Sequence, residues 1–147
     1  MRSIFWAIVL IAMVAGCATG KTSSTISDKE RDAFNQKQND TIRITNDSLE
    51  YEIVIIEPGF YFWLNSIAFP RGHYSQKFLE ARNRLLVLEW NNRVMQPQVF
   101  DPNLYLLPID YNPSIDYGYE VNYQLYYYFI YFQRKYNQRL TVFVPRI

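Results

Sequence analysis

The chain has 147 residues, with 15 basic and 14 acidic side chains and a formal net charge of +1. The first sixteen residues carry one charge, Arg2. Without them 14 bases balance 14 acids, and a nucleic-acid partner, which needs a basic surface, is not expected. The single cysteine, Cys17, excludes an intramolecular disulfide and a cysteine-rich metal site.

The N-terminus consists of an apolar run that leads to the cysteine of the chain. An apolar run covers Ile4 to Val14, and as a helix it rises about 16 Å, too little to span a hydrocarbon core of roughly 30 Å. It ends in Val14-Ala15-Gly16-Cys17, small residues before a cysteine as in a lipobox. The resemblance implies cleavage before Cys17 and acylation of that residue, and several acyl chains hold a protein stably on a membrane. The alternative is an ordinary secretory signal with an incidental cysteine.

These features predict the compartment of the protein. Residues 1–16 are expected to be a signal peptide, and no acid follows Cys17 at Ala18 or Thr19 to signal inner-membrane retention. We therefore expect a lipid anchor in the outer membrane with the domain facing the periplasm. Exposure on the cell surface stays open.

Residues 17–40 are predicted to be the lipidated cysteine and a flexible tether. The stretch from Ala18 to Asp40 is strongly charged, and its large apolar side chains are Ile26 and Phe34. Such a segment buries too little surface to offset the entropy of ordering it. As a coil its ends lie about 25 Å apart, with no more than a transient helix over residues 29–38.

The globular domain is predicted to cover residues 41–147 and to contain a three-stranded sheet. Apolar and polar residues alternate from Thr41 to Thr45, as in a half-buried strand. Residues 49–56 form a second strand that is apolar on both faces over Ile53-Val54-Ile55-Ile56. A strand buried on both faces needs two neighbours, and Thr141 to Val144 is the best candidate for the other one.

About three helices are expected to pack on this sheet. They cover residues 60–68, residues 76–95 with Ser75 as the N-cap, and residues 119–138. Four prolines make residues 96–118 a long irregular loop. The sequence therefore predicts an aromatic-rich α+β fold.

Four groups of short segments in the predicted domain form a recognisable set. They are Glu57-Pro58-Gly59-Phe60 with Trp63-Leu64, Tyr74-Ser75-Gln76 with Phe78-Leu79-Glu80, Glu89-Trp90-Asn91 with Arg93-Val94 and Gln96-Pro97, and residues 115–123. These segments resemble an uncharacterised family of small lipoproteins from Bacteroidota-type Gram-negative bacteria. The resemblance covers most of residues 41–138 and the lipobox, and it implies localisation and a domain boundary but no activity.

The last predicted helix is apolar nearly all round, so it must be covered on two sides. One interpretation is that the loop over residues 96–118 covers its second face, with tyrosine hydroxyls reaching backbone or water. The other is an exposed binding face for a partner protein or a glycan. That face consists of Tyr119, Tyr123, Tyr126, Tyr127 and Tyr131, with Ile130 between them.

Charged residues project into the apolar side of the middle predicted helix. Arg82, Glu89 and Arg93 are expected to form either a partly buried ion-pair network or a cleft. In a cleft, Glu89 would act as an acid or base while the arginines hold an anionic substrate.

No metal and no cofactor is expected. The oxygen-bearing residues between Asp110 and Glu120 resemble a calcium loop only loosely, because Ile115 stands where the glycine of the sharp turn belongs. His73 is the only histidine, which makes a zinc site improbable.

The sequence as a whole favours a non-enzymatic accessory lipoprotein that binds an envelope protein or glycan. Its membrane contact would be made through lipidated Cys17. Two alternatives stay open: a glycan-acting hydrolase that uses Glu89 or Glu57, and a purely structural envelope protein.

Overall fold

The computed structural model describes residues 25–37, 41–143 and 147. It has the predicted α+β class, with four helices and a two-stranded antiparallel sheet in these residues. The predicted signal peptide and Cys17 lie outside the described residues. The elements are α2 (Asp28–Phe34), β1 (Thr41–Asn46), the 3-10 turn η1 (Asp47–Leu49), β2 (Tyr51–Ile56), α3 (Phe60–Ser66), α4 (Gln76–Val94) and α5 (Gly118–Lys135).

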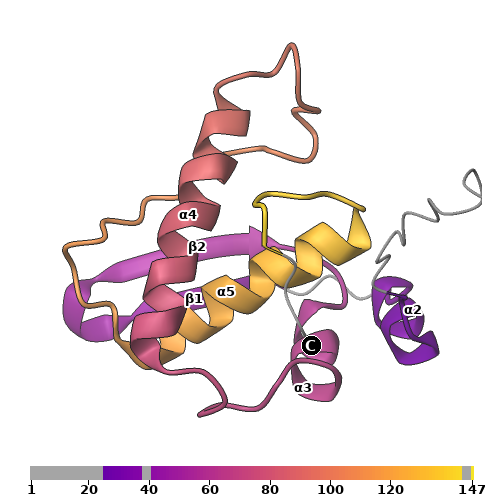
Figure 1. Ribbon diagram of the computed structural model, residues 1–147, viewed down its shortest axis with the longest axis horizontal. Helices are drawn as coiled ribbons and strands as arrows, with labels where there is room; N and C mark the ends of the chain where they lie inside the picture. Colours follow the sequence, from indigo (N-terminus) through magenta and orange to yellow (C-terminus); the bar gives the residue numbers. More distant parts are fainter. Residues whose placement is uncertain (1–24, 38–40, 144–146) are drawn as a thin grey trace, which may run out of the picture.

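Helix α5 is the central element of the domain. It packs against α4, α3 and β1, while α2 packs on α3 (Figure 1). Every side chain from Val121 to Gln133 except Gln124 is buried, which satisfies the need for cover on more than one side. The two long helices are joined in the core by Asn83, whose Nδ2 donates to the Asn122 carbonyl at 2.9 Å.

The predicted helix ends agree with the structure to within a few residues. The Ser75 hydroxyl accepts a hydrogen bond from the Phe78 N–H at 3.3 Å, as expected of an N-cap, and α4 ends just before Pro97. Gly118, at φ +79°, opens α5, and its N–H donates to the Asp116 carboxylate at 2.9 Å.

The predicted third strand is wrong for the described residues. Thr141 to Phe143 form a bend, because the Arg139 guanidinium donates to the carbonyls of Thr141 at 3.1 Å and Val142 at 2.7 Å. Val142 is 89 % exposed, and Val144 lies outside the described residues. The sheet therefore pairs β1 with β2 alone, and no strand in the described part of the chain pairs with the other edge of β2.

The segment predicted as a tether contains a packed helix. Helix α2 begins with a capping box, in which Ser27 accepts from the Glu30 N–H and Glu30 accepts from the Ser27 N–H, each at 3.2 Å. Ala33 is fully buried and Glu30 is 1 % exposed. The expectation of a coil does not hold for α2, because the helix packs against the domain.

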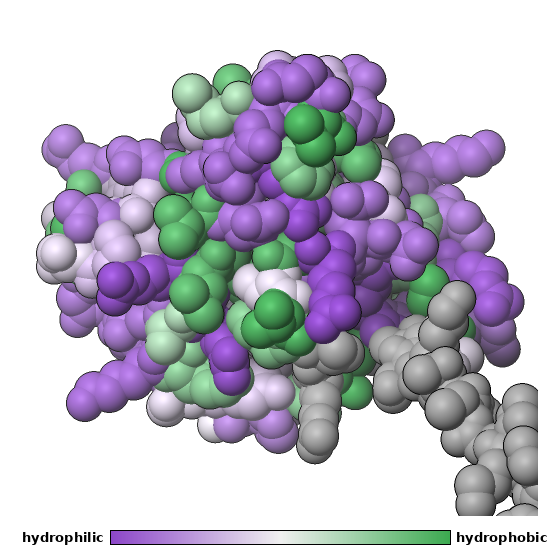
Figure 2. Space-filling view, turned by 45° about the horizontal axis from the view of Figure 1, so that its top comes forward, coloured by the Kyte–Doolittle hydropathy of each residue, from purple (hydrophilic) through white to green (hydrophobic). Residues whose placement is uncertain are grey.

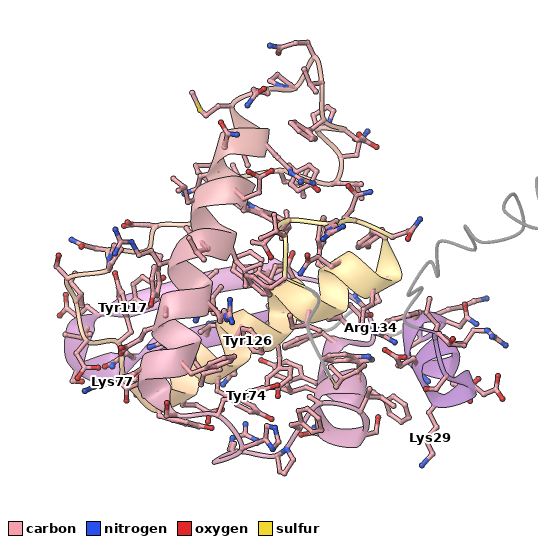
Figure 3. All side chains as sticks on the ribbon, viewed as in Figure 1. Lys29, Tyr74, Lys77, Tyr117, Tyr126 and Arg134 are labelled. Carbon is pink, nitrogen blue, oxygen red and sulfur yellow. The ribbon has the colours of Figure 1, made fainter. Side chains whose placement is uncertain are left out.

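A buried ion pair holds α2 on the domain. The Glu30 carboxylate accepts hydrogen bonds from the Arg134 guanidinium of α5 and from Trp63 Nε1 of α3 at 3.1 Å. Figure 3 shows Arg134 beside α2, while Lys29 points away from the domain. Burial opposes ionisation of Glu30, but the bonds from Arg134 and Trp63 outweigh it and lower the pKa of the carboxyl group.

Candidate functional site

A half-open cavity of about 530 Å³ lies between β2, the loop after α4 and the C-terminal half of α5. Its walls are mainly apolar and aromatic, which is typical of ligand sites of this size. Tyr51 ties the loop to the sheet, since its hydroxyl donates to the Asp110 carbonyl at 2.5 Å. The lining residues are Glu52, Ile53, Val54, Ile55, Glu57, Trp90, Asn103, Leu104, Leu106, Leu107, Pro108, Ile109, Asp110, Tyr128, Phe132 and Tyr136.

Three large apolar side chains of the lining are exposed to solvent. Val54 of β2 is 53 % exposed, and Leu106 and Leu107 of the loop are 71 % and 74 % exposed. The loop is held in place beneath them, because Trp90 Nε1 donates to the Leu107 carbonyl at 2.9 Å. Exposed apolar groups around an apolar cavity are typical of a binding site. We call Val54, Leu106 and Leu107 the apolar rim.

The inner polar groups of the cavity come from Glu57, Tyr136 and Tyr128. Glu57 is 6 % exposed and accepts from Lys135 Nζ at 2.7 Å and from the Tyr136 hydroxyl at 2.9 Å. Burial, followed by the charge of Glu57, raises the pKa of Tyr128 above its usual value. Burial and the Glu57 carboxylate raise the pKa of Tyr136 in the same way. Both phenols are therefore protonated at neutral pH.

All ionisable groups that line the cavity, apart from the phenols, are carboxylates. Glu52 pairs with Arg43 at 3.2 Å on the surface, and Glu57 pairs with Lys135. The exposed Asp110 side chain has no ionic partner in the described residues. No Lys, Arg or His side chain lines the cavity. The site therefore favours a ligand with a cationic or hydrogen-bond-donating group.

The predicted tyrosine face lies inside the core and not on the surface. Tyr127 and Tyr131 are 0 % exposed, and Tyr123 and Tyr126 are 2 % exposed. Tyr119 is half-buried, and its hydroxyl accepts from the Gly72 N–H at 2.7 Å. The interpretation as an exposed binding face is wrong, because α2, α3 and the loop over residues 67–75 cover these rings.

Aromatic contacts show how this cover is made. Tyr131 packs edge-on against Trp63 of α3 and Phe34 of α2, with ring centroids 5.5 and 5.4 Å apart. Tyr126 packs against Tyr74 at 5.8 Å, and the two rings lie together between α4 and α5 in Figure 3. Such contacts contribute about 0.5–1.5 kcal/mol each beyond burial.

We expected the loop over residues 96–118 to cover the tyrosine face of α5, but it covers the opposite face. Tyr105 of the loop packs on Phe132 and Trp90 at 5.4 and 5.0 Å, on the side of α5 that carries Tyr128 and Phe132. A long loop does cover an apolar face of α5, but it encloses the cavity and not the tyrosine face.

The three charged residues that we singled out on α4, Arg82, Glu89 and Arg93, do not form one cluster. Arg93 Nε donates to Glu89 at 2.7 Å, and Arg93 also bonds the Tyr105 hydroxyl at 2.8 Å. Arg82 instead lies over the rings of Phe78 and Phe143, at 5.1 and 4.3 Å. The Glu89–Arg93 pair holds the loop against α4 and supports the structural interpretation over the cleft.

Apolar side chains are also exposed along the outer side of α4 and just beyond it. Figure 2 shows that side, where green apolar groups are separated by purple hydrophilic ones. The interruption of this surface makes it a weaker candidate than the cavity. The exposed residues are Leu85, Leu88, Met95 and Val99.

Sequence reasoning named two polar residues of the cavity, Glu57 as a possible catalytic carboxylate and Asp110 in a loose calcium-loop pattern, and it did not predict the cavity itself. A signal was available in Leu104-Tyr105-Leu106-Leu107-Pro108-Ile109, an apolar run inside a segment with too many prolines for a helix or a strand. An irregular apolar segment has to pack on something or remain exposed for a partner.

The described part of the chain has neither a cluster of metal-binding side chains nor a helix able to span a membrane. His, Asp and Glu side chains there form no group of three that could hold a metal ion. No helix in that part has the length and hydropathy needed to cross a bilayer.

Comparison with curated proteins finds no match, and comparison with solved structures finds none either. A model of a family of unknown function, DUF6146, matches residues 5–144. This confirms that the chain resembles an uncharacterised family, whereas the lipoprotein character and the bacterial group stay predictions. Since the match covers nearly the whole sequence, the chain belongs to the family of unknown function DUF6146.

Proposed function

We propose that this protein is an accessory lipoprotein of the cell envelope that binds a partner protein in the cavity beside β2. Its anchor is lipidated Cys17, and its place is the outer membrane with the domain in the periplasm. The observation that carries the binding role is the apolar rim of Val54, Leu106 and Leu107 around a half-open cavity of about 530 Å³.

A binding role is favoured over hydrolysis by the state of the two candidate carboxylates. Glu57 is held by Lys135 and Tyr136, and Glu89 is held by Arg93. A glycosidase needs an acid and a second carboxylate facing each other across the substrate. Here each carboxylate is hydrogen-bonded to a neighbouring cation, an arrangement that stabilises packing.

The anchor is tested by replacing Cys17 with serine. The wild-type protein is expected to incorporate an alkyne analogue of palmitate in its own cells and to sediment with the membranes. Cys17→Ser is expected to lose the label and to leave the membrane fraction, because the sulfur that carries the lipid is gone. Thr19→Ser is the control that keeps the cysteine. Labelling of Cys17→Ser, or an unlabelled wild type, would contradict a lipid anchor at this position.

The binding role is tested by placing a photoreactive phenylalanine analogue in the cell-expressed protein. At Leu107, which is 74 % exposed on the apolar rim, irradiation is expected to give a discrete cross-linked band. At Leu88 on α4, which is 68 % exposed and outside the cavity, the same analogue is expected to give none. Equal products at both positions, or none at Leu107, would favour a purely structural protein.

A further inference from the structure

In the part of the chain that the structure describes, one edge of β2 has no partner strand, and the register of the sheet shows which backbone groups of β2 are directed there. The Arg43 N–H of β1 donates to the Tyr61 hydroxyl at 3.2 Å, so it points away from β2. Arg43 is paired with Val54 in the antiparallel register. In an antiparallel ladder, a pair of opposite residues is of one of two kinds. The N–H and C=O groups of both residues point toward the partner strand, or those of both residues point away from it. The N–H and C=O of Val54 are therefore directed to the free edge.

The same alternation applies along the strand. Glu52 and Ile56, two residues from Val54 on either side, also direct their backbone groups outward. Within the described residues, the N–H and C=O of Val54 make no hydrogen bond. An unpaired strand edge is a ready template for another extended chain.

This free edge opens into the cavity. Four consecutive residues of β2, Glu52 to Ile55, line the cavity. Successive side chains of a strand point to opposite faces of the sheet, so a space that touches all four runs along the edge of the strand. Across the space lie the loop residues from Asn103 to Asp110 and the rings of Tyr128 and Phe132.

The size of the cavity agrees with a short piece of strand. The volume of one strand residue is about 160 Å³, which is the product of the rise per residue, the spacing between strands and the spacing between packed sheets. A cavity of about 530 Å³ therefore receives about three residues, and its open side allows the segment to continue beyond them.

We propose that the partner adds an extended peptide segment to the free edge of β2, with apolar side chains in the cavity and a basic side chain near Asp110. This deepens the proposed function and rests on it. The backbone of the segment would pair with Val54 and Glu52, as in other strand-addition complexes. Its basic residue would face Asp110, the lining carboxylate that has no ionic partner in the described residues, whereas Glu52 and Glu57 are paired with Arg43 and Lys135.

An acyl chain is the less favoured occupant. It would fill the apolar space, but it would cover the outward N–H and C=O of Val54 without a hydrogen bond, and an unpaired buried polar group opposes binding. It would also gain nothing from the carboxylates of the lining. A peptide strand uses the edge, the apolar walls and the acidic groups together.

The probe is a random ten-residue peptide library displayed on phage, selected against the natural protein purified in mild detergent. Selected peptides are expected to alternate apolar residues and to carry a Lys or Arg. The tightest peptide is then synthesised, and its binding is measured through the change in tryptophan fluorescence that it causes at Trp90, which lines the cavity.

Val54→Pro tests the backbone pairing. Proline removes the outward N–H of residue 54 and none of the hydrogen bonds between β1 and β2, so the sheet is expected to persist. We expect peptide binding to weaken at least about tenfold, whereas Val54→Thr, which keeps the N–H and the branched shape, stays within about threefold. Circular dichroism and thermal melting show whether each variant is folded.

A second measurement needs no variant of the protein. The selected peptide is made with every second backbone nitrogen methylated, in each of the two registers, which keeps its side chains and removes alternate donors. One register is expected to lose at least about tenfold in affinity for the wild type. Equal binding of both methylated peptides and of the parent would overturn strand addition, even if Val54→Pro failed to fold.

The remaining outcomes separate this inference from the proposed function. Dodecanol that changes Trp90 fluorescence, with no selected peptide, would show a small apolar ligand in the cavity and overturn strand addition while the binding role stands. If neither peptide nor dodecanol binds and Leu107 gives no cross-link, the proposed function itself fails.

Discussion

Gly59→Ala is expected to destabilise the protein by about 3 kcal/mol or more and to displace α2. Gly59 has φ +83°, a conformation that costs an L-residue with a side chain about 1–2 kcal/mol. A Cβ at this position would also lie 2.0 Å from the Ala33 carbonyl oxygen of α2 and 3.2 Å from the Tyr131 hydroxyl. Neither the helix backbone nor a fully buried ring can move aside cheaply. Chemical denaturation measures the loss, and hydrogen exchange of the α2 amides measures the displacement.

Gly72→Ala is the matched control for this substitution. Gly72 has φ +88°, but an added Cβ would meet nothing within 4 Å. Only the backbone cost is expected there, about 1–2 kcal/mol, with α2 protected from exchange as in the wild type. Equal losses for the two variants would show that the close approach of α2 to Gly59 does not exist in solution.

Glu30→Ala is expected to release α2 from the domain. The Glu30 carboxylate is the acceptor for two buried donors, Arg134 and Trp63 Nε1. Removing one partner of a buried ion pair costs about 3–5 kcal/mol, and undocking of α2 is the route by which the chain can reduce that cost. Limited trypsin digestion is expected to cut after Lys29 and Arg31 much faster in this variant. Asp28→Ala is the control, because the Asp28–Arg31 pair is exposed, at 93 % and 64 %, and is expected to contribute little.

The same contact is expected to depend on pH. Because the folded-state pKa of Glu30 lies below its ordinary value of 4.5, its contribution to docking is fully present above that value. The contribution is lost as the pH falls through the folded-state pKa. Trypsin does not act in acid, so exchange of the α2 amides is the measurement, corrected for the intrinsic pH dependence by the Glu30→Ala variant. Protection of α2 that persists equally in both proteins at acid pH would contradict a role for this carboxylate.

The elements that sequence predicted correctly are those fixed by local signals. The N-cap Ser75 marks the start of α4, and Pro97 marks where the helix has to end. The alternation of apolar and polar residues around Ile42 and Ile44 marks β1. Helix α2 also had a local signal, the capping box of Ser27 and Glu30. What sequence could not provide was its docking, because Glu30 meets Arg134, 104 positions further along the chain. A charged residue in a polar stretch predicts exposure, and here tertiary contacts decide otherwise.

The two larger errors of the sequence analysis are the exposed tyrosine face on α5 and the third strand beside β2. Both concern which segment covers an apolar surface. Periodicity shows that α5 is apolar nearly all round, but it does not say which segment covers which face. The strand predicted at Thr141 had the right composition to pair with β2. Hydrogen bonds from Arg139 to the carbonyls of Thr141 and Val142 turn the chain instead. Within the described residues, the free edge of β2 lies along the cavity, for which the sequence offered only the irregular apolar run over residues 104–109 as a signal.

The docking of α2 also bears on how the domain would respond to mechanical load. In a lipid-anchored protein, tension between bilayer and domain would reach α2 and the residues just before it, including Thr25, before it reached the core. The contact of α2 with α3 is smaller than the packing of α4 on α5, so the helix would detach before the core opens. Residues 28–40 would then add up to about 45 Å of extended chain. The protein would accommodate stretching of the envelope by extension while its folded core remained intact.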